Sequence, residues 1–110
     1  MERQEFESLV HKALGGVPEQ FRRYLENVDV IVDEWPSQDQ LAGHLVDDDD
    51  LLLGLYEGVP LTERADYLDV LPDRITIFQR SIEAICENDE QTVEEVRTTV
   101  IHEIAHHFGI

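Results

Sequence analysis

The sequence has few cysteines, few positive charges and no long apolar runs. Cys86 is the single cysteine among 110 residues, which excludes a disulfide within the chain and fits a reducing compartment. Its neighbours Ile82 and Ile85 are apolar, so we expect Cys86 to be a small core residue. No apolar run approaches the roughly 20 residues of a membrane span, and the N-terminus MERQEFESLV does not resemble a signal peptide. These absences predict a cytoplasmic protein.

Positive charge is scarce. Eight Lys and Arg residues, with Lys12 the only lysine, stand against 25 Asp and Glu, and the formal net charge is −17. Such a surface repels phosphate backbones and anionic lipid, so nucleic-acid and membrane partners are disfavoured. A cationic partner or a metal ion is favoured, although a solvated acidic surface that aids solubility is the more ordinary interpretation.

The length of the chain fits a single domain with one core over residues 1–110. Apolar residues at three- and four-residue steps predict an amphipathic first helix that ends at Gly15 and Gly16, and a second helix can begin at Pro18. Alternating valines predict a half-buried strand over 28–35. A weak short helix follows over 37–45.

The middle of the chain predicts two more strands. VDDDD at 46–50 resembles a calcium loop only loosely, because the ligand spacing and the turn glycine are missing, and we expect a solvated loop. Strands are expected over 51–58 and 73–78, with a turn at 58–60, and a helical stretch carries Ile82 and Ile85. Helices around three short strands predict an α+β domain with one sheet and helices packed against it.

The last helix, over about 90–108, has the clearest pattern. Thr92 and Glu95 have the spacing of an N-terminal capping box. An apolar stripe predicts the face that packs on the core, and its residues are Val93, Val96, Val100, Ile104 and Phe108. At about 100° per residue, His102 and His106 fall on the side opposite Ile104.

HEIAHHFG at 102–109 contains two histidines four residues apart. Residues at this spacing lie about 6 Å apart along one helix face, so two imidazole nitrogens can converge on one zinc ion at about 2.0–2.1 Å each. Glu103 projects beside the pair, where a carboxylate can act as general base without being a ligand. His107 turns back towards the stripe and is expected to be packed. His11 and His44 have no partner at ligand spacing and are expected at the surface.

Three segments in this order resemble a family of small bacterial zincin-like metallopeptidases, over about positions 25–110: LLGLYEGVPL, LPDRITIFQRSIE and VIHEIAHHFGI. The resemblance implies a minimal zincin fold, with a three-stranded sheet, helices and a C-terminal helix that carries the HExxHxxG motif. It also implies that His102 and His106 are Zn²⁺ ligands and that Glu103 is the base. Hydrolysis of peptide bonds by a zinc-activated water is the implied activity, and a peptide or protein is the implied substrate.

The resemblance further implies that Gly109 turns the chain so that a residue three positions later, usually Asp, becomes the third ligand. That position is 112, and the sequence ends at Ile110. We therefore expect a shortened version of a longer gene product, truncated just before the third ligand, although an upstream carboxylate could substitute. With two protein ligands instead of three, the affinity for zinc should fall steeply.

Three functions remain open from the sequence. The leading one is a zinc-dependent peptidase, in which LLGLYEG offers a sheet edge to an extended peptide. Plain core structure is an equally weighted alternative for this strand. A non-catalytic acidic binding module on a zincin scaffold is the alternative, favoured by the net charge and by the missing ligand. Zinc-dependent hydrolysis of a non-peptide amide is a weaker third. Glu103 favours an enzyme, because binding alone does not need a base beside two histidines. The oligomeric state is not indicated.

Overall fold

The computed structural model describes residues 1–42, 51–58 and 72–110. Two α-helices, α1 (Arg3–Gly15) and α2 (Glu19–Arg22), and a 3-10 turn, η1 (Arg23–Leu25), precede the first strand, β1 (Val28–Asp33). A short helix, α3 (Gln38–Ala42), lies between β1 and the strand β2 (Gly54–Glu57). The strand β3 (Asp73–Phe78) leads directly into α4 (Gln79–Ile85), and α5 (Asp89–Phe108) ends the chain.

The three strands form one mixed sheet in the order β1-β3-β2. β1 is parallel to the central strand β3, with Val30 opposite Ile75, and β2 is antiparallel to β3, with Tyr56 also opposite Ile75. β2 is therefore an edge strand of the sheet. The predicted α+β fold, a small three-stranded sheet packed with helices, is confirmed.

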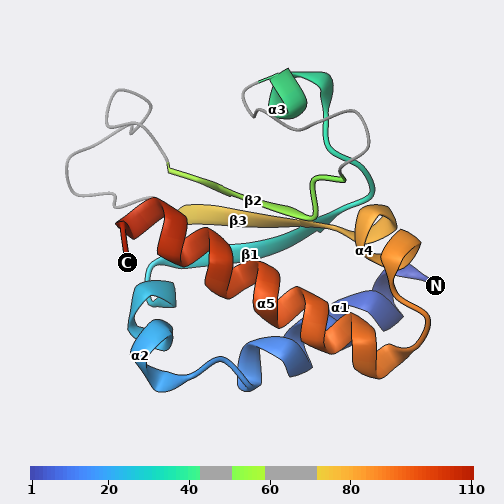
Figure 1. The fold of residues 1–110 in the computed structure, drawn as a ribbon, viewed down its shortest axis with the longest axis horizontal. Coiled ribbons are helices and arrows are strands. Elements are labelled where there is room, and N and C mark those ends of the chain that lie inside the picture. The colour runs from blue at the N-terminus through green and yellow to red at the C-terminus, as the bar shows by residue number, and fades with distance from the viewer. Residues whose placement is uncertain (43–50, 59–71) are drawn as a thin grey trace.

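Two long helices, α1 and α5, lie together on one side of the sheet (Figure 1), and α5 contacts β2. Their apolar faces meet the inward side chains of β2 and β3 in one core. Because the buried residues of α1 and α5 recur at three- and four-residue steps, each helix presents one face to this core. The fully or nearly fully buried members are Phe6, Val10, Ala13, Val17, Tyr56, Ile75, Ile77, Ile82, Val93, Val96, Val100 and Ile104.

The start of α5 differs from the predicted capping box. Asn88 is the N-cap, and its side-chain oxygen accepts a hydrogen bond from the backbone N–H of Gln91 at 2.9 Å. Thr92 lies inside the first turn, where it is buried and donates to the carbonyl of Asn88. The prediction placed the cap four residues too late, because Asn88 fills the role expected of Thr92, and the side chain of Gln91 accepts a hydrogen bond from the N–H of Glu87, just before the cap.

Other predictions needed smaller corrections. β1 ends at Asp33 and not at Trp35, whose side chain is exposed. The apolar stripe of α5 is buried from Val93 to Ile104, but Phe108 is 43% exposed, because the helix runs past the edge of the core there. Cys86 is only partly buried, and Ile85 is exposed. The solvated loop expected at 46–50, His44, and positions 59 and 60 of the expected turn lie outside the described residues.

Within the described ranges, none of the helices has the length and apolar character needed to cross a membrane.

Candidate functional site

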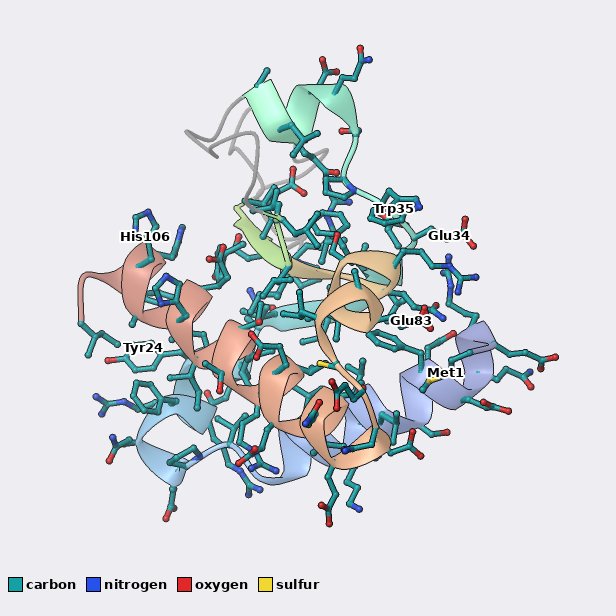
Figure 2. The ribbon with its side chains drawn as sticks, turned by 45° about the vertical axis from the view of Figure 1, so that its right-hand side comes forward. Met1, Tyr24, Glu34, Trp35, Glu83 and His106 are labelled. Carbon is teal, nitrogen blue, oxygen red and sulfur yellow. The ribbon has the colours of Figure 1, made fainter. Side chains whose placement is uncertain are left out.

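The core residues and the motif histidines lie on opposite sides of the last helix, α5. Val96, Val100 and Ile104 are fully buried, whereas His102 and His106 are exposed. Figure 2 shows the His106 ring projecting outward near the C-terminal end of α5. The helix is continuous across the motif, so the two imidazoles keep the spacing of one helical turn. Neither ring has a hydrogen-bond partner among the described residues, which leaves ring nitrogens free to bind an ion.

Glu103 does not point freely into solvent. Its carboxylate oxygen Oε1 accepts a hydrogen bond from the backbone N–H of Tyr56, in β2, at 2.9 Å. The carbonyl of Leu53 accepts a hydrogen bond from the N–H of Phe78, so the alternation of an antiparallel ladder turns the backbone groups of Gly54 and Tyr56 away from β3. Glu103 is therefore bonded to the outer edge of β2 in the described three-stranded sheet, and its second oxygen has no hydrogen-bond partner among the described residues.

An open pocket of about 350 Å³ lies between α5 and the chain that enters β2. One wall is made by three consecutive residues, Leu52, Leu53 and Gly54, and the other by α5. His102 and Glu103 line the pocket at one end, and Glu95 lines it two turns earlier in the helix. The site thus brings together two of the three predicted residues in one concave surface, with His106 one turn further along the exposed face of α5.

Gly54 allows this close approach of helix and strand. A Cβ atom at this position would lie 2.6 Å from Cγ2 of Thr99 and 3.2 Å from Cδ1 of Ile77. Real Cβ contacts are not that short, so a side chain here would push α5 away from β2. Separation of the two elements would also stretch the hydrogen bond between Tyr56 and Glu103, which lies one turn further along the helix.

His107 has a packing role. Its ring stacks on Tyr56 with a centroid distance of 3.9 Å and meets the Phe108 ring edge-on at 4.9 Å. The Tyr56 hydroxyl donates a hydrogen bond to Oδ2 of Asp73 at 2.7 Å. Burial, followed by the hydrogen bond and the charge of Asp73, raises the pKa of the Tyr56 hydroxyl well above its usual range. These contacts fix the end of α5 against the sheet edge.

The helix ends as its glycine predicts. Gly109 has φ 69°, in the left-handed region, and the backbone N–H groups of Gly109 and Ile110 both donate to the carbonyl of Ala105. Glycine is favoured here because other residues meet a steric penalty in this conformation. The chain therefore turns directly after the motif.

Residues 25–110 match the family described as zincin-like metallopeptidase. The chain belongs to this family. The match covers all three strands and the whole of α5. A solved structure described as a conserved hypothetical protein from Thermo thermophilus superposes with a TM-score of 0.59 and 22% identity, over 98% of this chain and 94% of that chain. At this identity the likeness shows the fold alone. No curated protein matches the chain.

The donor set of this zincin-like chain fits a zinc ion in part. Two exposed imidazoles one turn apart are nitrogen ligands of the kind that zinc prefers, and structural or catalytic sites need at least one more protein ligand. Within the described ranges, no group of three or more His, Cys, Asp or Glu side chains is close enough to hold a metal ion. The residues described thus offer two of three protein ligands, and the roles of His102, His106 and Glu103 stay predictions.

Sequence reasoning identified the motif of this zincin-like protein but missed its surroundings. Nothing in the order of residues indicated that the Tyr56 N–H bonds Glu103, because the two are 47 positions apart. Glu95 was interpreted as part of a helix cap and instead lines the pocket. The glycine in LLLGLYEG was noticed as an interruption of the strand, and that signal marks the close approach to Thr99.

Proposed function

We propose that this protein is a zinc-dependent peptidase in which His102 and His106 hold the ion and Glu103 is the general base. One observation carries the proposal. Glu103, inside the HExxH motif, is bonded to the outer edge of β2 in the described sheet and lines a pocket together with His102. The proposed base, one proposed ligand and a sheet edge that could bind a peptide therefore lie next to one another in a chain of the zincin-like metallopeptidase family.

The protein groups have separate tasks in this mechanism. His102 and His106 would hold a zinc ion, and that ion would supply the Lewis acidity that polarises a scissile carbonyl and lowers the pKa of water. Glu103 takes up a proton from the attacking water and later returns it to the leaving amine. The N–H of Tyr56 holds Oε1 of Glu103, so the second oxygen is kept in a fixed orientation for this transfer.

The edge of β2 offers a binding mode for an extended substrate. The outward backbone groups of Gly54 lie beside the pocket and can pair with a peptide by strand addition, as unpaired sheet edges do. Tyr56 already donates its N–H to Glu103, so pairing along β2 would be concentrated at the Gly54 end. The peptide would then lie along the pocket, with one end close to Glu103.

The third ligand is expected three residues after Gly109, at position 112, with an upstream carboxylate as the alternative. The turn at Gly109 favours the first choice, because it reverses the chain at the end of the motif helix. A non-catalytic acidic binding module remains the second candidate function. It is favoured by the net charge of −17 and by the set of only two metal ligands within the described ranges.

Two chain lengths test the function. The 110-residue chain and a chain lengthened by two residues, with aspartate at position 112, are titrated with zinc and then incubated with a mixed peptide library. The longer chain should bind zinc far more tightly and cleave peptides, and cleavage should stop when zinc is chelated. Equal zinc affinity in both would point to an upstream carboxylate as the third ligand. A zinc-loaded longer chain that cleaves no peptide would favour the binding module.

A further inference from the structure

The pocket beside Glu103 extends well beyond the two residues that the proposed chemistry uses. It continues along α5 towards the start of the helix, past Thr98 and Thr99, to the carboxylate of Glu95. Among the described residues that line it, Glu95 and Glu103 are acidic and none is Lys or Arg. In the metal-free protein, a cationic group entering this pocket therefore meets these two carboxylates and, among the described lining residues, no Lys or Arg side chain that would repel it.

Glu95 is the unusual member of this set. It is half-buried, and it has no hydrogen bond or salt bridge with any residue that the structure describes. Its neighbour Glu94 has the same charge but is exposed and does not line the pocket. A carboxylate that loses part of its hydration without gaining a partner weakens the fold, so a bound cation would restore what Glu95 lacks.

The opposite wall suits the rest of a long basic side chain. Leu52 and Leu53 are half-buried at the entry to β2 and face the pocket from the strand side. The methylene stems of Lys and Arg pack on such apolar surfaces while their charged ends reach a polar partner. An apolar wall that faces a carboxylate with no hydrogen bond or salt bridge among the described residues is thus a better match for Lys or Arg than for a small cation.

We propose that this pocket binds a Lys or Arg side chain of the substrate, with Glu95 as the partner of its charge. The proposal rests on the peptidase function argued above and defines the substrate as a basic peptide. Glu95 is a specificity-determining residue in this account and takes no part in the chemistry at Glu103.

The position of the basic residue follows from the helix and the strand. Glu95 precedes Glu103 by eight residues, about 12 Å along α5, and an extended peptide advances about 3.3 Å per residue. Since a long side chain covers part of that distance, the basic residue lies two or three positions from the scissile bond. Gly54, at the start of β2, contacts Thr99, and Tyr56, two residues later, bonds Glu103, one turn further along α5. The strand β2 and the helix α5 therefore run in the same direction. A peptide added antiparallel to β2 therefore places the basic residue after the scissile bond.

Peptide binding to the metal-free 110-residue protein tests this assignment without relying on turnover. The probes are a capped alanine-rich hexapeptide with one arginine and the same peptide with citrulline, which keeps the shape and removes the charge. Amide chemical shifts locate the bound peptide, and calorimetry gives its affinity. The variants are Glu95→Gln and, as a matched control with the same change in net charge, Glu94→Gln.

The wild-type protein should bind the arginine peptide about fivefold more tightly than the citrulline peptide, as expected for one charge-assisted hydrogen bond at a half-exposed site. Shifts should be centred on Gly54, Thr98 and Thr99. Glu95→Gln should abolish the preference for arginine, and Glu94→Gln should retain it. Equal losses in the two variants, shifts centred elsewhere, or no preference in the wild type would overturn the proposal. A preserved preference with no cleavage by any zinc-loaded form would refute the peptidase function alone.

Discussion

The two sides of α5 have different roles. One side, with Val96, Val100 and Ile104, is fully buried against the sheet and α1. The other side carries His102 and His106, which are exposed and have no hydrogen-bond partner among the described residues. Because residues on opposite sides of one helix share few contacts, changes on the two sides should have nearly independent effects. The residues that hold the fold and those proposed for the chemistry therefore lie largely on different sides of a single helix.

Two contacts join the helix α5 to the strand β2. Glu103 reaches from α5 to the backbone of Tyr56, and Gly54 lets Thr99 approach the same strand. The hydrogen bond from Tyr56 aligns the carboxylate of Glu103 with the edge of β2. The lack of a side chain at Gly54 lets β2 lie close to α5. These contacts mean that the strand β2 should respond to changes on either side of the helix.

The largest effect is expected for zinc uptake on the exposed side. His102→Ala and His106→Ala should each abolish specific zinc binding, because each removes one of the two imidazoles that face the same direction. His107→Ala should leave zinc binding nearly intact, since its ring stacks on Tyr56. Calorimetric titration of the three variants measures this. Equal losses in all three would show that the assignment of ligands by helical phase is wrong.

The buried side should instead control stability. Ile104→Ala should lower the free energy of unfolding by about 2–5 kcal/mol, because the side chain is fully buried and its removal leaves a cavity. His106→Ala, on the exposed side of the same helix, should change it by less than about 0.5 kcal/mol. Urea denaturation followed by circular dichroism compares the two. Similar losses in both variants would show that the two sides are coupled.

Gly54→Ala tests the contact between the sides. The added methyl group would overlap with Thr99, so we expect a loss of about 1–3 kcal/mol in the free energy of unfolding. Gly15→Ala is the matched control, because a Cβ atom there meets nothing within 4 Å. Urea denaturation of both variants should show a loss only for Gly54→Ala. A fully stable Gly54→Ala protein would mean that β2 and α5 can separate without cost.

Metal removal should have the smallest effect on the fold. The core made by α1, α5 and the sheet contains no part of the histidine pair, so the protein should remain folded without metal. Zinc should add stability only through its binding free energy. Circular dichroism spectra before and after treatment with a chelator should agree closely. Loss of helical signal on chelation would show that the metal is part of the folding reaction, as it is in zinc fingers.

The sequence predicted most of what depends on periodicity. The 3.6-residue repeat in α5 placed Val96 and Ile104 in the core, and the 2-residue repeat in β1 predicted the alternation of half-buried and exposed residues. HEIAHHFG placed two histidines on one helix face and a glycine at the helix end, where Gly109 has its left-handed conformation. Each of these features is decided by residues close together in the chain.

The features that sequence reasoning missed depend on contacts between distant segments or on a choice between local signals. The bond from Tyr56 to Glu103 and the pocket that ends at Glu95 require β2 and α5 to lie side by side. The cap was misplaced because two overlapping signals competed, and Asn88 with Gln91 took precedence over Thr92 with Glu95. Phe108 continued the apolar repeat but lies beyond the core, which a repeat alone cannot indicate.

Substitution of Glu103 tests the central claim most directly. In the chain with aspartate at position 112, Glu103→Gln keeps an oxygen that can accept the Tyr56 N–H and removes only the ability to take up a proton. Zinc content and cleavage of the peptide library are measured on the same samples of the wild type and the variant. We predict an unchanged zinc content and a loss of turnover of about 100-fold or more, in the range of a general base. Turnover that survives the substitution, or zinc that is lost with it, would contradict the assignment of Glu103 as a base that is not a ligand.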